Sequence, residues 1–211
     1  APGTPIGIAD FWIWKYANLS TNYYNWEHVR STGSMLAGEG FSMKGVTDTS
    51  NNLALSQNYI LEGKPNNGAI TLNIDNQKDY LVGNPYASAM DANKFILDNT
   101  ETTGAIYYWE HFGGGTHNTG GYQGGYAIYN LSGGIPAVKY NYDTGAPDPT
   151  GGNGTKTPGQ YIPVAQGFFI TGTADGGSIN FNNNQRAFQK ENVNSVFLRN
   201  SSSQSSSNTN N

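Results

Sequence analysis

The tripeptide Trp-Glu-His occurs twice, at residues 26–28 and 109–111, and His117 follows the second copy after a glycine-rich segment. Imidazole nitrogens and carboxylate oxygens are ligands that zinc accepts in proteins. Successive side chains of a strand point to opposite faces, so Glu110 should face away from His111. A metal site would therefore need the turn after residue 111 to bring His111, His117 and Glu110 together. The alternative is a core-facing Trp followed by polar residues at the end of a strand.

A second group of oxygen ligands lies in residues 141–159, where Asp143 and Asp148 occur among Gly, Pro and Thr. Ca²⁺ is bound by carboxylate and carbonyl oxygens, and a loop of this composition could wrap it. The segment lacks the spacing of an EF-hand, and Asp is also a common turn residue, so an ordinary surface loop is the competing interpretation. We expect no bound cofactor, with calcium as the alternative.

Aromatic residues gather in the same half of the chain. The candidates for ligand contact are Trp109, Tyr122, Tyr126, Tyr140 and Tyr142. Such rings can stack on sugars or make adhesive contacts, because each combines an apolar body with a polar tip. Tyr and Trp are also ordinary strand residues. The sequence leaves both interpretations open.

Catalytic patterns do not stand out. The chain has no nucleophile elbow, no pair of neighbouring carboxylates and no histidine–aspartate–serine set with recognisable spacing. A glycan-active or metal-dependent hydrolase would need distant residues to converge, namely Glu27, His28, Glu110, His111 and His117. We therefore predict that the chain is not an enzyme.

Composition restricts the possible partners. Only 12% of the 211 residues are charged, against about 25% in typical domains, and such uncharged polar surfaces suit extracellular β-proteins. The absence of cysteine excludes disulfides and thiolate metal sites. The net charge is −4 and the basic residues are scattered, so nucleic acid and anionic membrane surfaces are poor partners. No apolar run approaches the roughly 20 residues that span a bilayer.

Short aromatic and β-branched runs bounded by Gly, Asn and Pro predict a mostly β fold, either a β-sandwich or a jelly-roll-like arrangement. Turn signals predict hairpins over residues 60–74 and 168–181. One short helix is expected near residues 88–99. Ser88 and Asp91 have the spacing of a capping box, and Asn99 closes the segment.

Two segments, residues 38–45 and 165–172, are similar in sequence, and each is followed by a turn and an alternating strand. They suggest a β-rich module over residues 1–199 with two related halves, about 1–87 and 104–199, joined by the helix. Residues 200–211 contain only Ser, Asn, Gln and Thr. This stretch has no apolar surface to bury and should be a linker or tail.

Four stretches together carry a family resemblance: residues 38–45, 63–71, 80–92 and 167–186. In them the chain resembles β-rich modules of large secreted, adhesin-like surface proteins of Bacteroidota, often exported by type IX secretion. The Gly-Asn-Pro-Tyr sequence at residues 83–86 is the most specific part. The resemblance implies a location outside the cell, at the cell surface or outer membrane, and transfers no catalytic residues. The sorting domain usual at the C-terminus of such proteins is not seen, so we expect a fragment or anchoring by another polypeptide.

Together these observations predict an extracellular structural or adhesion module that acts through contacts with other surface proteins or with other domains of a larger polypeptide. The alternative is a carbohydrate-binding module that uses Tyr and Trp of residues 113–159. A glycan-active hydrolase is the least favoured reading.

Overall fold

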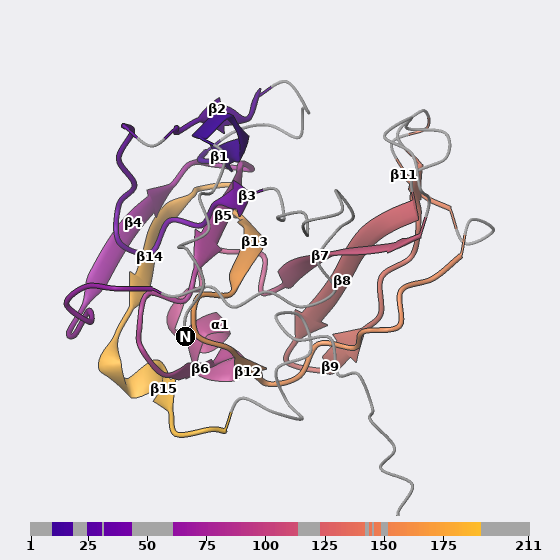
Figure 1. Ribbon diagram of the computed structural model, residues 1–211. Coiled ribbons are helices and arrows are strands. Elements are labelled where there is room, and N and C mark those ends of the chain that lie inside the picture. The colour runs from indigo at the N-terminus through magenta and orange to yellow at the C-terminus, as the bar shows by residue number, and fades with distance from the viewer. Residues whose placement is uncertain are drawn as a thin grey trace, which may run out of the picture.

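The computed structural model describes residues 10–18, 25–30, 32–43, 61–113, 123–141, 144, 146–148 and 152–190. The Ser/Asn-rich segment 200–211 lies outside them. The described part is mostly β, as predicted, and contains one α-helix (Figure 1). None of its helices has the length and apolar character to cross a membrane.

The main layer is a five-stranded antiparallel sheet in the order β5-β13-β7-β8-β9. Its strands are β5 (Asp79–Gly83), β7 (Ile106–Gly113), β8 (Gln123–Asn130), β9 (Gly133–Ile135) and β13 (Gly167–Thr171). β7 and β8 form the longest pair, with Trp109 opposite Tyr126. β13 links this pair to β5.

The second layer packs against one face of this sheet and contains several short elements. It includes the two-stranded ribbon of β4 (Ile70–Ile74) and β14 (Gly177–Phe181), the three-stranded sheet of β6 (Ala89–Asp91), β12 (Tyr161–Ile162) and β15 (Arg186–Ala187), and the helix α1 (Ala92–Asp98). In Figure 1 the ribbon lies on the left, and β7, β8 and β9 lie on the right. The arrangement is sandwich-like.

The remaining elements are short. They are the N-terminal sheet of β1 (Ile13–Lys15), β2 (Glu27–His28) and β3 (Ser42–Met43), the pair β10 (Tyr140–Asn141) and β11 (Ala146–Pro147), and the 3₁₀ turns η1 (Asp10–Trp12) and η4 (Asn183–Gln185).

The hydrophobic core lies between the two layers. Phe95 of α1 joins them, because its ring contacts Phe168 of β13 at 5.4 Å and Phe181 of β14 at 5.3 Å between centroids. Alternation along β13 buries Phe168 and Ile170 and leaves Phe169 half-exposed on the other face. Strand periodicity therefore separates a core face from an outer face.

Buried amide side chains complete the hydrogen bonding of the second layer. The Asn99 side chain accepts a hydrogen bond from the backbone N–H of Asn180 at 2.6 Å and donates to the Asn180 carbonyl at 3.0 Å. It also donates to the Phe95 carbonyl at the end of α1. Asn84 donates in the same way to the carbonyls of residues 88, 162 and 163. These amides act as peptide groups where no strand is available to pair.

The helix is present but begins later than predicted. Its N-cap is Asp91, whose carboxylate accepts hydrogen bonds from the N–H groups of Asn93 and Lys94. Ser88 lies before β6, where its hydroxyl accepts a hydrogen bond from Arg186. The capping-box assignment was wrong because residues 89–91 pair with β12 and β15 as a strand, which postpones the helix start to Ala92.

The predicted hairpins do not form in the described residues. β14 pairs with β4, while β13 pairs with β5 and β7. Residues 61–69 contain no strand. The long-range pairing places Leu72 and Ile179 opposite each other, both buried in the core. Strands from the two halves expected in the sequence therefore share one ribbon and one core.

The two similar segments lie on either side of β5. Each begins with a turn in which a residue with positive φ, Gly38 (92°) or Ala165 (60°), precedes the first paired residue. Glu39 bridges to β5 on one side, and β13 pairs with β5 along its length on the other. Both segments thus reach β5 from a turn, but residues 42–43 then pair with β1, whereas residues 167–171 follow β5 along its length.

We predict that Asn99→Ala destabilises the fold by about 3 kcal/mol, because it leaves the buried backbone groups of Asn180 without their partner. Asn76→Ala, in an exposed turn, is the matched control and should change stability by less than about 0.5 kcal/mol. Urea unfolding monitored by circular dichroism measures both. Equal stability of the two variants would contradict the role assigned to Asn99.

Two core tyrosines predict a loss of stability at alkaline pH. Burial raises the pKa of the Tyr80 and Tyr108 phenols, and the hydrogen bond that Tyr80 donates to Glu39 raises the pKa of Tyr80 further. Tyrosine side chains of the unfolded chain ionise near pH 10, whereas the two buried phenols of the folded chain resist ionisation at that pH. The stability that these two groups contribute below about pH 10 should therefore be lost as the pH rises further.

Tyrosinate absorbance and the unfolding midpoint, followed together against pH, test this expectation. Tyr108→Phe should reduce the alkaline loss of stability. The expectation fails if all tyrosines of the folded protein titrate together near their ordinary pKa without unfolding.

Candidate functional site

Alternation along β7 confirms the predicted separation of the second Trp-Glu-His triplet. Tyr108 and Glu110 are buried on the core side, whereas Trp109 is half-exposed and His111 exposed on the outer face. The tight pairing with β8 fixes this arrangement, because a slip by one residue would exchange the two faces. Within β7, Glu110 and His111 therefore do not approach a common ion.

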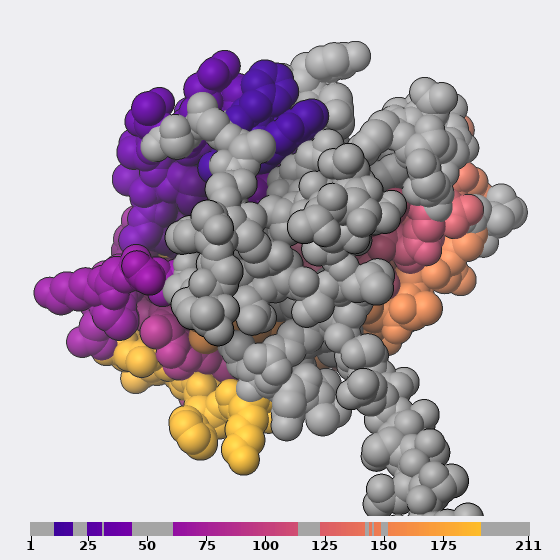
Figure 2. All heavy atoms as spheres, viewed as in Figure 1, coloured from indigo at the N-terminus to yellow at the C-terminus, as the bar shows by residue number. Residues whose placement is uncertain are grey.

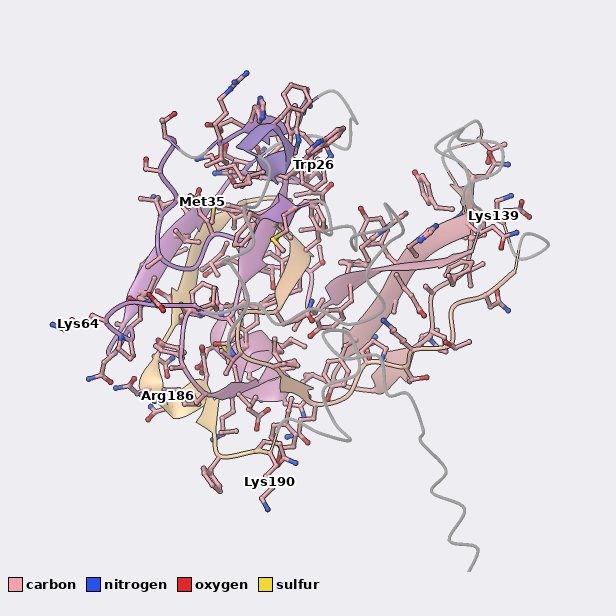
Figure 3. The ribbon with its side chains drawn as sticks, viewed as in Figure 1. Trp26, Met35, Lys64, Lys139, Arg186 and Lys190 are labelled. Carbon is pink, nitrogen blue, oxygen red and sulfur yellow. The ribbon has the colours of Figure 1, made fainter. Side chains whose placement is uncertain are left out.

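A continuous row of aromatic rings lies along this outer face and ends at a buried ring, Tyr16, which is 5% exposed. Trp109 contacts Tyr126 at 4.9 Å between centroids, and Tyr126 contacts Phe169 at 5.7 Å. Phe169 in turn contacts Trp26 at 5.9 Å, and Trp26 contacts Tyr16 at 5.3 Å. We call these five residues the aromatic row. It joins β8 and β7 through β13 to the N-terminal segments, where Figure 3 labels Trp26.

The rings of the aromatic row pack edge to face. The interplanar angles of the four successive contacts lie between 67° and 87°. This T-shaped geometry is a preferred one for aromatic pairs, and it holds each ring rigidly against the next. Because neighbouring planes are nearly perpendicular, the row offers apolar edges and faces in alternation rather than one flat platform.

A second aromatic group lies in the N-terminal sheet. Trp14 stacks on His28 with 4.2 Å between centroids and an interplanar angle of 10°. Phe11 contacts the His28 ring at its edge and is 53% exposed, and the neighbouring Trp12 is 42% exposed. The register of β1 and β2 pairs Trp14 with His28. Strand periodicity therefore directs this pair to the same side as Tyr16 and Trp26.

Glu110 has a structural role that the sequence did not reveal. Its carboxylate accepts hydrogen bonds from the backbone N–H groups of Thr155 at 3.1 Å and Lys156 at 3.3 Å. Gly154 packs so closely against this carboxylate that a Cβ atom there would collide with it. Glu110 thus holds residues 154–156 on the core side of the sheet.

The other predicted site residues are dispersed or lie outside the description. Tyr140 belongs to β10, and Asp148 forms an ion pair with Lys139 at 3.9 Å. The structure does not describe Tyr122, Tyr142, His117 or Asp143. Among the residues that it does describe, no group of three or more His, Asp and Glu side chains could hold a metal ion.

The residues considered for hydrolysis occupy separate environments. Glu27 is exposed and pairs with Lys15 at 3.6 Å, whereas Glu110 is buried beneath residues 154–156. His28 stacks on Trp14 in the N-terminal sheet, and His111 is exposed on β7. The described residues bring none of these carboxylate and imidazole groups into a catalytic pair.

Sequence reasoning missed a buried carboxylate, Glu39, whose side chain is only 4% exposed. It accepts hydrogen bonds from the Tyr80 hydroxyl at 2.9 Å and from the Leu36 N–H at 2.7 Å, and Lys15 Nζ lies 3.7 Å away. This cluster ties the N-terminal sheet to β5 and so positions Tyr16 and Trp26 beside Phe169. In the similar segment, residues 165–172, the position equivalent to Glu39 is Gln166. The shared pattern therefore did not indicate that Glu39 is a buried charge.

Comparison with known proteins places the chain in a family. Residues 3–211 match the model of a family described as a domain of unknown function (DUF8693). The chain belongs to this family. No curated protein and no solved structure matches it. The family description names no activity.

We predict that Glu110→Gln destabilises the fold by about 1–2 kcal/mol, because charge-assisted hydrogen bonds to two backbone N–H groups are weakened. Hydrogen exchange of the Thr155 and Lys156 amides should become faster. Glu62→Gln, at an exposed position, is the control and should change neither quantity. A Glu110→Gln protein indistinguishable from this control would refute the anchoring role.

Proposed function

We propose that the chain is an extracellular structural and adhesion module of the cell surface, which acts through contacts with neighbouring domains or subunits. The observation that carries the proposal is the aromatic row on the outer face of the five-stranded sheet. Trp and Tyr are enriched in protein interfaces because they bury a large area at low entropic cost and keep a polar group for hydrogen bonding.

The edge-to-face packing of the row favours a protein partner over a glycan. A carbohydrate-binding surface places ring faces where sugar rings can lie flat on them, and the nearly perpendicular planes of Trp109, Tyr126 and Phe169 interrupt such a platform. A protein surface can instead insert side chains between ring edges and faces. The ring contacts also hold the row in position before binding, which reduces the entropy lost on association.

The location outside the cell rests on composition and family resemblance. A chain with 12% charged residues and no cysteine relies on polar amides and aromatic packing for its stability. The similarity to adhesin-like modules of Bacteroidota supports export and a place in a larger surface polypeptide or assembly. No catalytic role is proposed, because the described residues supply no paired acid, base or nucleophile.

The test uses intact cells of the source organism, from which the gene for this protein has been deleted, as the binding partner. The purified chain should bind these cells. Combined Trp109→Ala and Tyr126→Ala substitutions should weaken binding by roughly thirtyfold or more, since truncating even one central interface aromatic costs about 2 kcal/mol. Phe188→Ala removes a fully exposed ring outside the row and should bind like the natural sequence.

A glycan array probed with the same proteins separates the alternatives. We expect no glycan to retain the natural chain. Retention that disappears with the Trp109 and Tyr126 substitutions would replace this proposal by carbohydrate binding. Unchanged cell binding by the double variant, shown by circular dichroism to be folded, would remove the aromatic row as the contact surface.

A further inference from the structure

Two asparagines of the chain are followed by glycine, Asn67 and Asn153. A glycine at this place leaves its own backbone nitrogen unhindered, because glycine has no Cβ. That nitrogen can attack the carbonyl carbon of the preceding asparagine side chain and close a succinimide ring. The fold places the two Asn-Gly pairs in opposite environments, so their reactivity should differ.

Asn67 lies in an exposed loop, residues 61–69, which precedes β4 and contains no strand. In Figure 2 the purple atoms of this loop stand out at the left side of the molecule. A Cβ atom at Gly68 would meet no other atom within 4 Å, so a ring can form there without a collision. The Gly68 N–H donates to Asn183 Oδ1 at 3.2 Å, an exposed hydrogen bond that water can replace.

Asn153 lies in a closed environment. The Gly154 N–H donates to the Ala137 carbonyl at 2.7 Å, and Asn153 forms an antiparallel bridge with Val138. A Cβ atom at Gly154 would collide with the Glu110 carboxylate. The attacking nitrogen is therefore engaged, and there is no space for a ring.

A guanidinium group lies beside the Asn67 amide. Arg186 Nη1 donates to Asn67 Oδ1 at 3.4 Å, and Arg186 Nε donates to Ser88 Oγ at 3.1 Å. Arg186 Cζ also lies 5.5 Å from the centre of the Tyr86 ring. No carboxylate in the described part of the chain forms an ion pair with Arg186. A carboxylate at residue 67 would therefore meet a positive charge that no other acidic group holds.

The loop is held at this place by one hydrogen bond on each side of Asn67. Asn66 Nδ2 donates to the Pro85 carbonyl at 2.9 Å, and the Tyr86 hydroxyl donates to the Gly68 carbonyl at 2.7 Å. Neither bond uses the Gly68 N–H or the Asn67 side chain. Residue 67 therefore stays beside the guanidinium, where Figure 3 labels Arg186 on the same side of the molecule as the loop.

We propose that Asn67 is a self-modification site, at which the folded protein converts the amide into a carboxylate that pairs with Arg186. The Gly68 nitrogen loses its proton to base and attacks Asn67 Cγ. The N–Cγ bond forms, the Cγ–Nδ2 bond breaks, and ammonia leaves with the proton. Water then opens the ring, and addition at Cγ gives aspartate whereas addition at the main-chain carbonyl gives isoaspartate. The net reaction consumes one water molecule and releases ammonia.

Arg186 contributes to both ends of this reaction. As Cγ becomes tetrahedral, negative charge develops on Oδ1, the atom to which Arg186 donates. In the product the hydrogen bond joins two charged groups, which makes it stronger than the bond to an amide. The modified chain carries one more negative charge, and the loop is fastened to β15. The inference goes beyond the proposed function, since the site contains no residue of the aromatic row.

Peptide mass spectrometry of the folded protein, incubated at mildly alkaline pH, tests the proposal. The peptide with Asn67 should gain the mass of an amide-to-acid conversion, and part of the product should be isoaspartate. The peptide with Asn153 should convert roughly tenfold more slowly or less, since Gly154 must first leave its hydrogen bond. Asn67→Gln keeps an amide at this position and should abolish the conversion, because the longer side chain closes a ring far more slowly.

The chain unfolded in urea is the control for sequence alone, and in it the two peptides should convert at similar rates. An Asn67 that remains an amide in the folded protein overturns the proposal. Conversion of Asn153 at the same rate as Asn67 in the folded protein does so too, because the fold would then select neither residue.

The part assigned to Arg186 has its own test in Asn67→Asp, which reproduces the aspartate product. Titration of this carboxyl by nuclear magnetic resonance should give a pKa below the ordinary value of about 3.9, because the guanidinium favours the charged form. The shift should disappear when Arg186→Gln is added. An ordinary pKa in Asn67→Asp, or the same lowered pKa in both proteins, would contradict the ion pair.

Discussion

Side-chain amides that replace missing backbone partners are the interaction on which this fold depends. The second layer consists of short strands and one short helix, so many backbone groups reach the core without a neighbouring strand. Leaving such groups unpaired costs about 1–3 kcal/mol each. Asn84, Asn99 and Gln185, all buried, supply the missing donors and acceptors. Asn99 hydrogen-bonds both the Phe95 carbonyl of α1 and the Asn180 carbonyl of β14.

This form of stabilisation explains the unusual composition. The chain has no disulfide and few charges. Asparagine is abundant, and at several positions its side chain has a structural role inside the fold in addition to its occurrence at the surface. Two of the buried carboxylates follow the same logic, because Glu110 binds backbone N–H groups and Glu39 binds a backbone N–H and a tyrosine hydroxyl. Polar residues inside the fold thus hold segments in place, whereas the aromatic row lies along the outer face of the main sheet.

The sequence predicts what depends on local periodicity and composition. The β-rich class, the presence of the helix, its end at Asn99 and the opposite directions of Glu110 and His111 all follow from patterns within a few residues. Pairing between distant segments does not, because β4 and β14 are joined by contacts across about half the chain and the turn signals pointed to local hairpins. The helix start was misjudged since pairing of β6 overrides the cap at Ser88. The aromatic row was partly anticipated through Trp109 and Tyr126, but its continuation to Phe169 and Trp26 requires the tertiary fold.

The claim that the aromatic row is a contact surface can be tested most directly by oxidative footprinting of the four tryptophans. The modification rate of each would be measured by mass spectrometry, once in the purified chain and once in the chain on the surface of the cells that produce it. The account predicts that Trp109 is modified in the purified chain and protected on the cell. Equal modification of Trp109 in both settings would contradict it.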